Sequence, residues 1–250
     1  MQVTPPFDLH CHLGAARNAE DAARMLERAH GGALVATLSA TDFAVASKRL
    51  SGIERVRVAA GLHPWTIADG TAGGSSVDAV ISLLDDVRYV GEVGLDFGKT
   101  HGQRREMQQE AFARIVRRCA KLGDRVLSVH GVHAAGDVLD ILEQSGVTRT
   151  CAVVLHRYTG STDQLWHAIG LGCLFSVSRA MLDTRRGREQ AKLIPAAQLL
   201  LETDGPEQGR AYDVPGVCRE LDGVLSDLER AHGSPLREQV CATSRRLLEL

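Results

Sequence analysis

Ionisable side chains stand at the ends of five segments that have the composition of β-strands. In chain order they form a His-x-His pair, a glutamate, two single histidines and an aspartate, namely His10, His12, Glu92, His130, His156 and Asp204. Six nitrogen and oxygen donors are about what two divalent metal ions take from a protein. Because two such ions turn water into a nucleophile at neutral pH and clamp the oxygens of a phosphoryl or acyl centre, the set indicates a hydrolase.

Each of these residues alone is weak evidence. Two alternating histidines on a strand are often incidental, and a single glutamate in a Gly-Glu-Val-Gly segment carries little information. Asp204, which precedes Gly205 and Pro206, is also typical of a turn. The recurrence of donors at equivalent ends of five different strands is what favours a metal site.

The composition is that of an ordinary globular protein. Of the 250 residues, 44% are hydrophobic and 24% are charged, and 29 basic against 31 acidic side chains give a formal net charge of −2. A chain so close to neutrality has no global positive field to attract nucleic acid or an anionic membrane. Binding of a polyanion would therefore depend on local basic groups.

No segment of the sequence has the pattern of a targeting or membrane signal. The first eight residues lack a basic region followed by an apolar run, and no stretch approaches 18 consecutive apolar residues, so we expect neither a signal peptide nor a transmembrane helix. The six cysteines are scattered without a Cys-x-x-Cys pair, which argues against a structural zinc site and fits a reducing compartment. We expect a cytoplasmic protein that does not bind membranes.

Short apolar segments alternate with helix-like segments along the chain. The predicted strands are 7–12, 33–38, 56–62, 89–93, 125–130, 152–156, 173–177 and 199–203. The predicted helices are 18–30, 42–50, 76–86 (capped by Ser75 or Ser76), 103–122, 135–144, 162–169, 186–193, 214–232 and 235–248. Eight such units without a Gly-rich dinucleotide fingerprint favour a parallel (β/α)8 barrel, or TIM barrel, of the α/β class over a doubly wound open sheet. No linker is long enough to divide the chain, so we expect a single domain over residues 1–250.

The barrel prediction explains where the donors stand, because active sites of such barrels lie at the C-terminal ends of the strands. Asp8, His10 and His12 have the same parity on the first strand, so their side chains share one face, with Asp8 one layer below as a candidate acceptor. Cys11 has the opposite parity and is excluded as a ligand. Glu92 lies within the fourth strand, where its carboxylate could bridge two cations.

Several motifs, found in order over nearly the whole chain, resemble the TatD family of metal-dependent hydrolases. The most specific are Gly-Glu-Val-Gly-Leu-Asp at 91–96 and Leu-Glu-Thr-Asp-Gly-Pro at 201–206, and the others are Phe-Asp-Leu-His-Cys-His-Leu at 7–13, Gly-Leu-His-Pro at 61–64, Ser-Val-His at 128–130 and the stretch 156–160. The resemblance implies the TIM barrel of the amidohydrolase superfamily. It also implies a Mg2+- or Mn2+-dependent deoxyribonuclease, often a 3′–5′ exonuclease, although some members of the family act on other phosphodiester, ester or amide bonds.

Carried over by position, the resemblance assigns a role to each donor. One metal would be held by His10, His12, Glu92 and Asp204, and the second by Glu92, His130 and His156, with Glu92 bridging. Asp204 would also orient or deprotonate the attacking water, so Asp204 and Glu92 are the expected catalytic residues. His63 would contact the scissile phosphate rather than a metal, although a rim histidine in a turn before Pro64 is the alternative. Mg2+ or Mn2+ are the expected cofactors, and donors of these types also accept Zn2+ or Ni2+.

The chain departs from the common pattern of the family around the substrate rather than around the metals. The segments that differ are Gly-Val-His at 131–133, Arg-Tyr-Thr-Gly at 157–160 and the short loop 207–215. Because of these changes, the resemblance does not identify the substrate. Divergent TatD-like proteins also occur as subunits of anti-phage gene clusters of the Qat type, so an antiviral assembly with protein partners is a further hypothesis.

Local charge supplies the evidence for a nucleic-acid substrate. Basic residues follow the fourth, sixth and seventh predicted strands, namely Lys99, Arg104, Arg105, Arg157, Arg179, Arg185, Arg186 and Arg188. A phosphate-rich strand of DNA, or of RNA, could follow such a rim, with Arg157 as the expected phosphate contact and with Trp65 and Tyr158 stacking on bases. Solvated helix caps and ion pairs explain the same arginines equally well.

Three functions remain open from the sequence. The first is a two-metal phosphodiesterase acting on DNA, and the second is a hydrolase of a small amide, ester or phosphate, which the altered rim favours. The third is a scaffold subunit whose docking surface would use the leucines of the last two helices, although core packing explains them equally well: Leu221, Leu225, Leu228, Leu247, Leu248 and Leu250. The complete set of six donors counts against an inert scaffold.

Overall fold

The computed structural model describes residues 7–250 and forms two compact units, which we treat separately. Unit 1 comprises the chain up to Ala36 together with Val45–Val58 and Phe175–Leu250, and unit 2 comprises Thr37–Ala44 and Ala59–Leu174. The first six residues, on which the expectation of no signal peptide mostly depends, lie outside the described residues. One domain over residues 1–250 stays a prediction.

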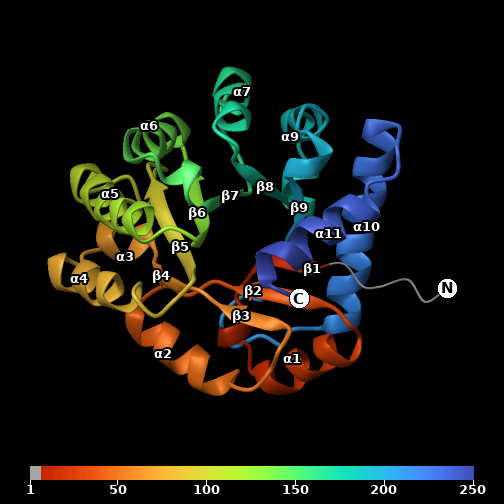
Figure 1. Ribbon diagram of the computed structural model, residues 1–250, viewed down its shortest axis with the longest axis horizontal. Helices are drawn as coiled ribbons and strands as arrows, with labels where there is room; N and C mark the ends of the chain where they lie inside the picture. The colour runs from red at the N-terminus through yellow and green to blue at the C-terminus, as the bar shows by residue number, and fades with distance from the viewer. Residues whose placement is uncertain (1–6) are drawn as a thin grey trace. The chain divides into compact units, whose positions relative to one another are not determined.

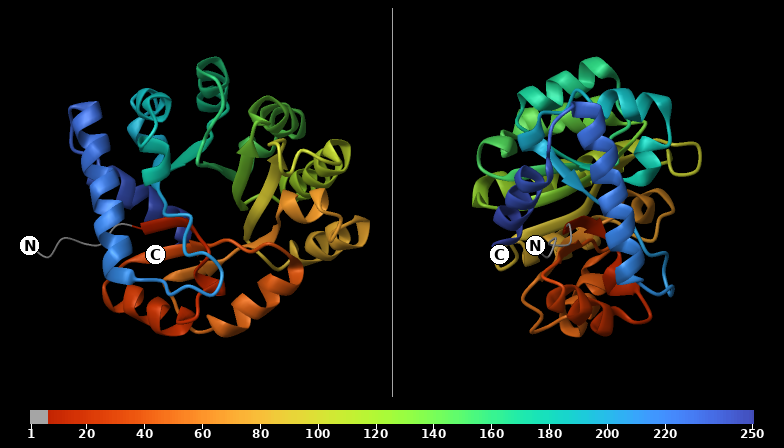
Figure 2. Two further views of the ribbon diagram at one scale, coloured as in Figure 1. Left: turned by 180° about the vertical axis from the view of Figure 1, so that it is seen from behind. Right: turned by 90° about the vertical axis from the view of Figure 1, so that its right-hand side faces the viewer.

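Unit 1 is built on two groups of parallel strands. β1 pairs with β2, β2 with β3, and β8 with β9. The strands are β1 (Phe7–Cys11), β2 (Gly32–Val35), β3 (Val56–Val58), β8 (Leu174–Val177) and β9 (Leu199–Leu201). The helices are α1 (Ala19–Arg28), α8 (Arg179–Leu182), α9 (Arg185–Ala191), α10 (Val214–His232) and α11 (Arg237–Leu248), with α2 (Ala40–Arg49) extending into this unit and short 3-10 turns at Leu13–Ala15 and Ala196–Gln198. α1 covers one face of β1–β3, and α11 contacts β1 and β9 (Figures 1 and 2).

A hydrophobic cluster beneath β1 holds the ligand-bearing strand in place. Every residue of β1 is buried, and Cys11 packs in a cluster with Leu26 of α1, Val35 of β2 and Tyr212. Full burial of one such aliphatic side chain contributes about 1.5–3 kcal/mol to the free energy of unfolding. Cys11 therefore belongs to the core, as its parity on the strand predicts.

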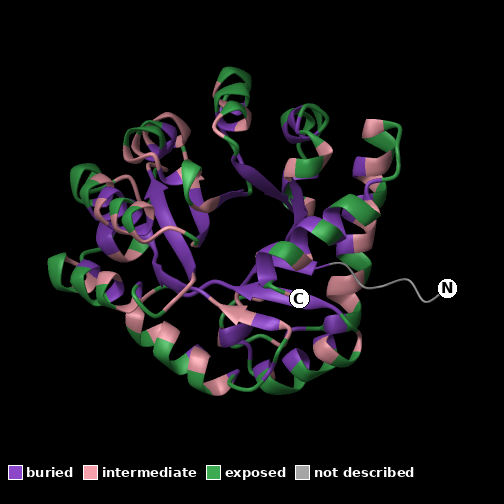
Figure 3. Ribbon diagram, in the orientation of Figure 1, coloured by how far each residue is buried: buried purple, intermediate pink, exposed green. Residues whose placement is uncertain are grey.

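Unit 2 is a run of four parallel strands with helices on their outer side (Figure 1). The strands are β4 (Ala60–Leu62), β5 (Tyr89–Asp96), β6 (Val126–Val132) and β7 (Ala152–His156). The helices are α3 (Pro64–Ala68), α4 (Gly74–Leu83), α5 (Arg105–Leu122), α6 (Ala135–Ser145) and α7 (Thr162–Gly170), with a 3-10 turn at Val147–Arg149. β5 is buried over its whole length, whereas the helices expose their outer faces (Figure 3). Burial on both faces is typical of parallel strands covered by helices.

The predicted strand over 56–62 is wrong as a single element, because β3 ends at Val58 and β4 begins at Ala60. The hydroxyl of Thr37 explains the break. Its Oγ1 donates to the carbonyl oxygen of Ala59 at 2.7 Å and accepts from the backbone N–H of Gly61 at 3.1 Å. A side chain therefore takes the backbone groups that a neighbouring strand would otherwise pair.

Gly61 allows the closest approach of backbone in unit 2. A Cβ atom at this position would lie 1.8 Å from the carbonyl oxygen of Thr37 and 2.6 Å from the backbone nitrogen of Glu92. The space that a side chain would fill is taken by the hydrogen bond from the N–H of Glu92 to the carbonyl oxygen of Thr37, at 3.0 Å. Glycine in the Gly-Leu-His-Pro motif thus lets the backbone around Glu92 be fixed by its neighbours.

The remaining differences from the predicted elements are shifted ends and short helices. For example, β2 ends at Val35 and not at 38, and β5 continues to Asp96 and not only to 93. α4 begins at Gly74 with Gly73 at its N-cap, not Ser75 or Ser76, and the Ser76 hydroxyl instead accepts from the N–H of Gly73 at 3.3 Å. The short helices α3 and α8 were not predicted, because four or five residues carry too little periodicity. Within residues 7–250, no helix combines the length and the hydrophobicity that crossing a bilayer requires. The cytoplasmic setting stays a prediction.

Candidate metal centre

Unit 1 brings together the donors of the first and last predicted strands. The Nε2 atom of His12 lies 3.3 Å from Oδ1 of Asp204, and the Nε2 atom of His10 lies 3.6 Å from the same oxygen. The two imidazole rings meet edge to face with their centroids 5.4 Å apart. One ligand atom from each of the three residues lies within 4.8 Å of the others, which is the spacing of a metal site.

Backbone hydrogen bonds between β1 and the segment after β9 produce this arrangement. The N–H of Asp204 donates to the carbonyl oxygen of His10 at 3.0 Å, and the N–H of His12 donates to the carbonyl oxygen of Gly205 at 2.7 Å. Asp204 itself has a φ of +58°, a left-handed conformation that aspartate tolerates better than most residues. The turn-forming character of Asp204 and its place among the donors are therefore compatible.

Asp8 anchors the same segment from below. Its Oδ1 accepts from the N–H of Thr203 at 3.0 Å, and its Oδ2 accepts from the hydroxyls of Thr203 and Tyr212 at 2.6 and 2.8 Å. Burial raises the pKa of Asp8 to about 7, although the hydrogen bonds from Thr203 and Tyr212 act in the opposite direction. Asp8 is thus an acceptor one layer below the histidines, as its parity predicts, and it fixes the residue that precedes Asp204.

Tyr212 is a contributor to the site that the sequence did not reveal. It is buried, and its backbone is tied to Asn18, whose side chain donates to the carbonyl oxygen of Tyr212 at 3.2 Å and accepts from its N–H at 2.8 Å. Tyr212 lies in the loop that the sequence marks only as shorter than usual. No local pattern could link it to Asp8, which is 204 positions away.

Replacement of Tyr212 by phenylalanine is expected to lower the free energy of unfolding by about 1–2 kcal/mol, because a buried hydrogen bond to the Asp8 carboxyl is lost. Urea denaturation followed by circular dichroism measures the change. Tyr158→Phe is the matched control, since the Tyr158 hydroxyl donates to the carbonyl oxygen of the exposed Ser161 at 3.0 Å, where water can replace it. Equal losses in the two variants would contradict a special role for the bond to Asp8.

In unit 2, three imidazole nitrogens converge on a single carboxylate oxygen. Oε1 of Glu92 lies 2.6 Å from Nδ1 of His130, 2.9 Å from Nε2 of His156 and 3.2 Å from Nε2 of His63. His130 and His156 also approach each other, with 3.2 Å between Nδ1 and Nε2. Glu92 is only 2% exposed, so the carboxylate is removed from water and compensated by these rings.

The pKa values of His63 and His130 shift in opposite directions, because the two rings have different hydrogen-bond partners. Burial lowers the pKa of His63, although the neighbouring Glu92 acts against this effect. Burial also acts to lower the pKa of His130, but hydrogen bonds to Asp96 and Glu92 outweigh it and the pKa is raised. His63 is therefore the ring that stays neutral more readily.

His63 is held as a hydrogen-bond donor by the start of α3. Its Nδ1 accepts from the backbone N–H of Trp65 at 3.2 Å, so His63 forms the N-cap of that helix. A neutral imidazole that accepts at Nδ1 carries its proton on Nε2. Because Nε2 points to Glu92, His63 presents N–H rather than a lone pair to the centre, which suits a phosphate contact better than a metal ligand.

Trp65 and Tyr158, both expected to stack on bases, have different surroundings. Trp65 is 43% exposed, and its indole stacks on His101 with centroids 4.5 Å apart and an interplanar angle of 21°. Tyr158 is buried, so the expectation that it stacks on bases is wrong. The aromatic side chain of Tyr158 therefore serves packing in the core and not the binding of substrate.

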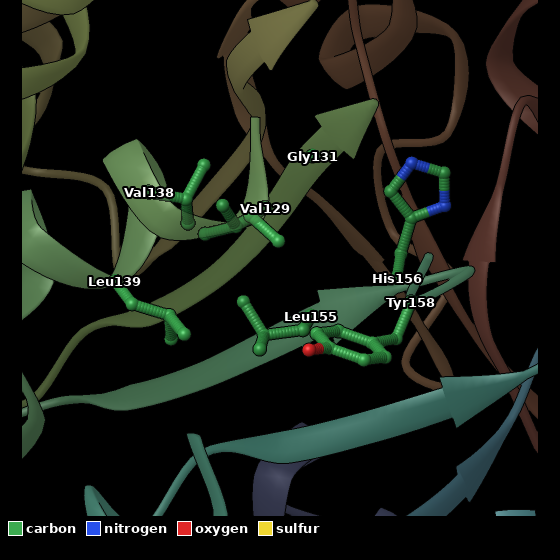
Figure 4. A pocket seen from close by; sticks show the side chains of 8 residues that line it. Val129, Gly131, Val138, Leu139, Leu155, His156 and Tyr158 are labelled. Atoms are coloured by element: carbon green, nitrogen blue, oxygen red, sulfur yellow. The ribbon is translucent and has the colours of Figure 1, made fainter. Parts of the chain in front are cut away.

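Tyr158 lines a small apolar cavity behind β7, of about 10 Å³. Leu155 and Tyr158 face Val129, Val138 and Leu139 across this cavity, while the His156 ring points away from them (Figure 4). A cavity of this size has room for about one water-sized probe and none for a base or a sugar. The substrate cannot be recognised there.

The predicted basic rim is smaller than the sequence suggests. Arg179 pairs with Asp227 at 2.5 Å, Arg188 donates to the carbonyl oxygen of Leu182 at 2.7 Å, and Arg105 lies over the Phe97 ring. These arginines stabilise their own chain, as the alternative interpretation predicts. Arg157 follows directly after β7 and is exposed.

Comparison with known proteins identifies the family of the chain. Residues 7–221 match the family described as TatD related DNase. The chain belongs to this family. The match confirms the predicted resemblance and the enzyme class, so the chain is a TatD-like metal-dependent hydrolase.

Curated relatives and a solved structure agree with this assignment. An uncharacterized metal-dependent hydrolase TatD of Mycobacterium tuberculosis is 31% identical over 212 residues, covering 80% of this chain and 79% of its own. A 3′-5′ ssDNA/RNA exonuclease TatD of Pantoea ananatis is 27% identical, with 80% and 79% covered. A TatD homologue of Escherichia coli has a crystal structure that matches with a TM-score of 0.83 at 23% identity, with 100% of both chains covered. The structural likeness confirms the predicted (β/α)8 fold of the metallo-dependent hydrolase type.

The residues of this chain fit the metal dependence of the family. Imidazole nitrogens and carboxylate oxygens are suitable donors for Mn2+, Zn2+ and Ni2+, and carboxylates also suit Mg2+. In unit 2, the ligand atoms of Glu92 and His130 lie within 4.8 Å of each other, and Nε2 of His156 lies 2.9 Å from Oε1 of Glu92. A buried carboxylate with imidazoles around it also offers a bound cation the charge and the lone pairs that it needs.

Proposed function

We propose that this TatD-like chain hydrolyses phosphodiester bonds of DNA, and of RNA where the strand is single, from the 3′ end and with two divalent metal ions. The convergence of His63, His130 and His156 on one oxygen of Glu92 carries the proposal. The Pantoea relative, a 3′-5′ ssDNA/RNA exonuclease by name, supports the substrate and the polarity.

Each of the two clusters of donors would hold one metal ion. His10, His12 and Asp204 would hold one ion, and Glu92, His130 and His156 the other, with Mg2+ or Mn2+ preferred and Zn2+ or Ni2+ as alternatives. When bound, the ions supply Lewis-acid polarisation of a phosphoryl oxygen and activation of water at neutral pH. Additional binding of the first ion by Glu92, as a bridge, stays a prediction from the resemblance.

Residues of the chain itself accept the proton of the attacking water and position the substrate. Asp204 is 18% exposed, so its carboxylate can accept a proton from the attacking water while it faces His10 and His12. His63 donates from Nε2 to an oxygen of the scissile phosphate. Arg157 pairs with a neighbouring phosphate, and the exposed face of Trp65 stacks on a base.

Digestion of end-labelled single-stranded DNA and RNA with Mg2+ or Mn2+ tests the proposal. A 3′–5′ exonuclease gives a one-nucleotide ladder from 5′-labelled DNA and early release of mononucleotide from 3′-labelled DNA. His10→Ala is expected to abolish both products. Intact DNA with every metal, and no difference between wild type and His10→Ala, would overturn the nuclease proposal.

A second candidate is hydrolysis of a small amide, ester or phosphate. The observation that favours it is the internal pairing of Arg105, Arg179 and Arg188, which reduces the positive surface available to a polyanion. Turnover of small substrates together with intact oligonucleotides would select this candidate.

Membership of an anti-phage assembly stays a prediction from the sequence. The leucines suggested as a docking surface are buried in unit 1, apart from Leu250, so they serve core packing: Leu221, Leu225, Leu228, Leu247 and Leu248. The suggestion that these side chains form a docking surface is therefore wrong.

A further inference from the structure

Asp96, the last residue of β5, is a buried carboxylate that receives hydrogen bonds from three directions. Its Oδ2 accepts from the indole N–H of Trp65 at 2.6 Å and lies 3.1 Å from Nε2 of His130. Its Oδ1 accepts from the backbone N–H of Gly98 at 2.8 Å. The sequence marks Asp96 only as the end of the Gly-Glu-Val-Gly-Leu-Asp motif and gives it no role.

The position of Asp96 is itself fixed from behind. The backbone N–H of Asp96 donates to Oε1 of Gln108 at 2.8 Å, and Gln108 is fully buried in α5. The amide of Gln108 also donates to the carbonyl oxygens of His101 and Gln103, at 2.8 and 2.9 Å. One buried side chain therefore anchors both the end of β5 and the loop that carries His101.

The contact with Asp96 decides which nitrogen of His130 is available to a metal. An ionised carboxylate only accepts hydrogen bonds, so the ring nitrogen that faces it carries the proton. Nε2 of His130 is this nitrogen. Nδ1 also faces a carboxylate, Oε1 of Glu92 at 2.6 Å, so both ring nitrogens can donate when no cation is bound. With a cation bound, Nδ1 would give up its proton and supply the lone pair, while Asp96 keeps the proton on Nε2. Carboxylates behind metal-bound histidines fix the tautomer and the orientation of the ring in this way.

His63 faces the same oxygen of Glu92, but its partners place the proton on the nitrogen that is nearest to that oxygen. Its outer nitrogen, Nδ1, faces a donor, the backbone N–H of Trp65, and not an acceptor. Its inner nitrogen therefore carries the proton, whereas the inner nitrogen of His130 would supply a lone pair to a bound cation. Trp65 contributes to both assignments, through its backbone N–H to His63 and through its indole N–H to Asp96.

We propose that Asp96 is a positioning residue that holds His130 in the tautomer that binds metal through Nδ1, and that the indole N–H of Trp65 fixes Asp96 for this task. The inference rests on the proposed metal site and gives Trp65 a second role beside base stacking. Contact of a substrate base with the exposed Trp65 ring is thereby connected to a metal ligand through one carboxylate oxygen.

Metal binding by the full chain, measured by calorimetry with Mn2+, is the first test. Asp96→Asn is expected to weaken the binding of one ion about 10- to 100-fold, the usual effect of removing a carboxylate behind a metal-bound histidine. An asparagine offers one oxygen to three donors, so an NH2 group must face at least one of them. Trp65→Phe keeps a ring and loses the indole N–H, and we expect about fivefold weaker binding, the size of one hydrogen bond. His101→Ala is the matched control, because it uncovers the same indole and leaves its N–H in place.

Nitrogen-15 NMR of the imidazole rings with diamagnetic Mg2+ or Zn2+ is the second test, and the wild-type protein is enough for it. The His130 signals, assigned by comparison with His130→Ala, are expected to show a protonated Nε2 and a metal-bound Nδ1. A protonated Nδ1 in the loaded wild type would overturn the proposal, even if Asp96→Asn fails to fold. Unchanged Mn2+ affinity in both Asp96→Asn and Trp65→Phe would also overturn it.

Failure of the proposed function gives a different result. If the wild type and His130→Ala bind the same number of Mn2+ ions with the same affinity, His130 is not a ligand and the metal site itself is wrong. If the wild type binds two ions and digests DNA while Asp96→Asn does the same, the metal site stands and only the role of Asp96 is wrong.

Discussion

Glu92→Gln is expected to reduce metal-dependent DNA hydrolysis on the order of 1,000-fold, the larger end of the effects seen when one electrostatic group of an active site is removed. The physical reason is that Oε1 of Glu92 faces three imidazole nitrogens at 2.6 to 3.2 Å. Glutamine keeps the shape of the side chain, removes the negative charge and presents either a weaker acceptor or an NH2 group to these rings. Initial rates on labelled single-stranded DNA with Mn2+, and the number of bound Mn2+ ions, measure the loss.

Glu106→Gln is the control for this experiment. Glu106 lies on α5 of the same unit and is exposed, so the same change of chemistry occurs away from the imidazoles. We expect normal rates and normal Mn2+ binding from it. A Glu92→Gln protein that retained more than about a tenth of the wild-type rate would contradict a central role for this carboxylate.

Asp204→Asn is expected to lower kcat about 1,000-fold, within the range for loss of a general base, and to leave KM for DNA little changed. Asparagine tolerates the left-handed backbone of this position, where φ is +58°. It therefore preserves the hydrogen bond from the backbone N–H to His10 and removes the charge and the proton acceptor opposite His10 and His12. Steady-state kinetics with Mn2+ separates kcat from KM.

Asp213→Asn provides the comparison for Asp204→Asn. Asp213 is 68% exposed and is 3.9 Å from the guanidinium of Arg219, a distance at which a surface pair contributes little. Wild-type kinetics are expected from it. A higher KM with an unchanged kcat in Asp204→Asn would assign Asp204 to substrate binding and remove it from proton transfer.

Much of the fold followed from local patterns along the chain. The predicted helices 214–232 and 135–144 match α10 and α6 within a residue, because Pro215 and Gly146 mark a start and an end through backbone restrictions that act locally. The strand over 56–62 was wrong, because the Thr37 hydroxyl that divides it comes from a different part of the chain. Local patterns predict an element well where its own residues decide it, and poorly where a distant side chain does.

The candidate site shows the same division. The sequence by itself determined which residues can act as donors and on which strand each lies, since residue type and alternation are local properties. Only the tertiary structure decided that Nδ1 of His130 and Nε2 of His63 face one oxygen of Glu92, and that the contacts of the two rings place a proton on Nε2 of each. The partners that set these protons, Asp96 and the backbone of Trp65, lie 34 and 2 positions from the rings they control. The contact between Asp96 and His130 depends on the packing of strands and loops against each other, which no spacing of residues in the sequence encodes. The contact of His63 with Trp65 is local to the start of α3.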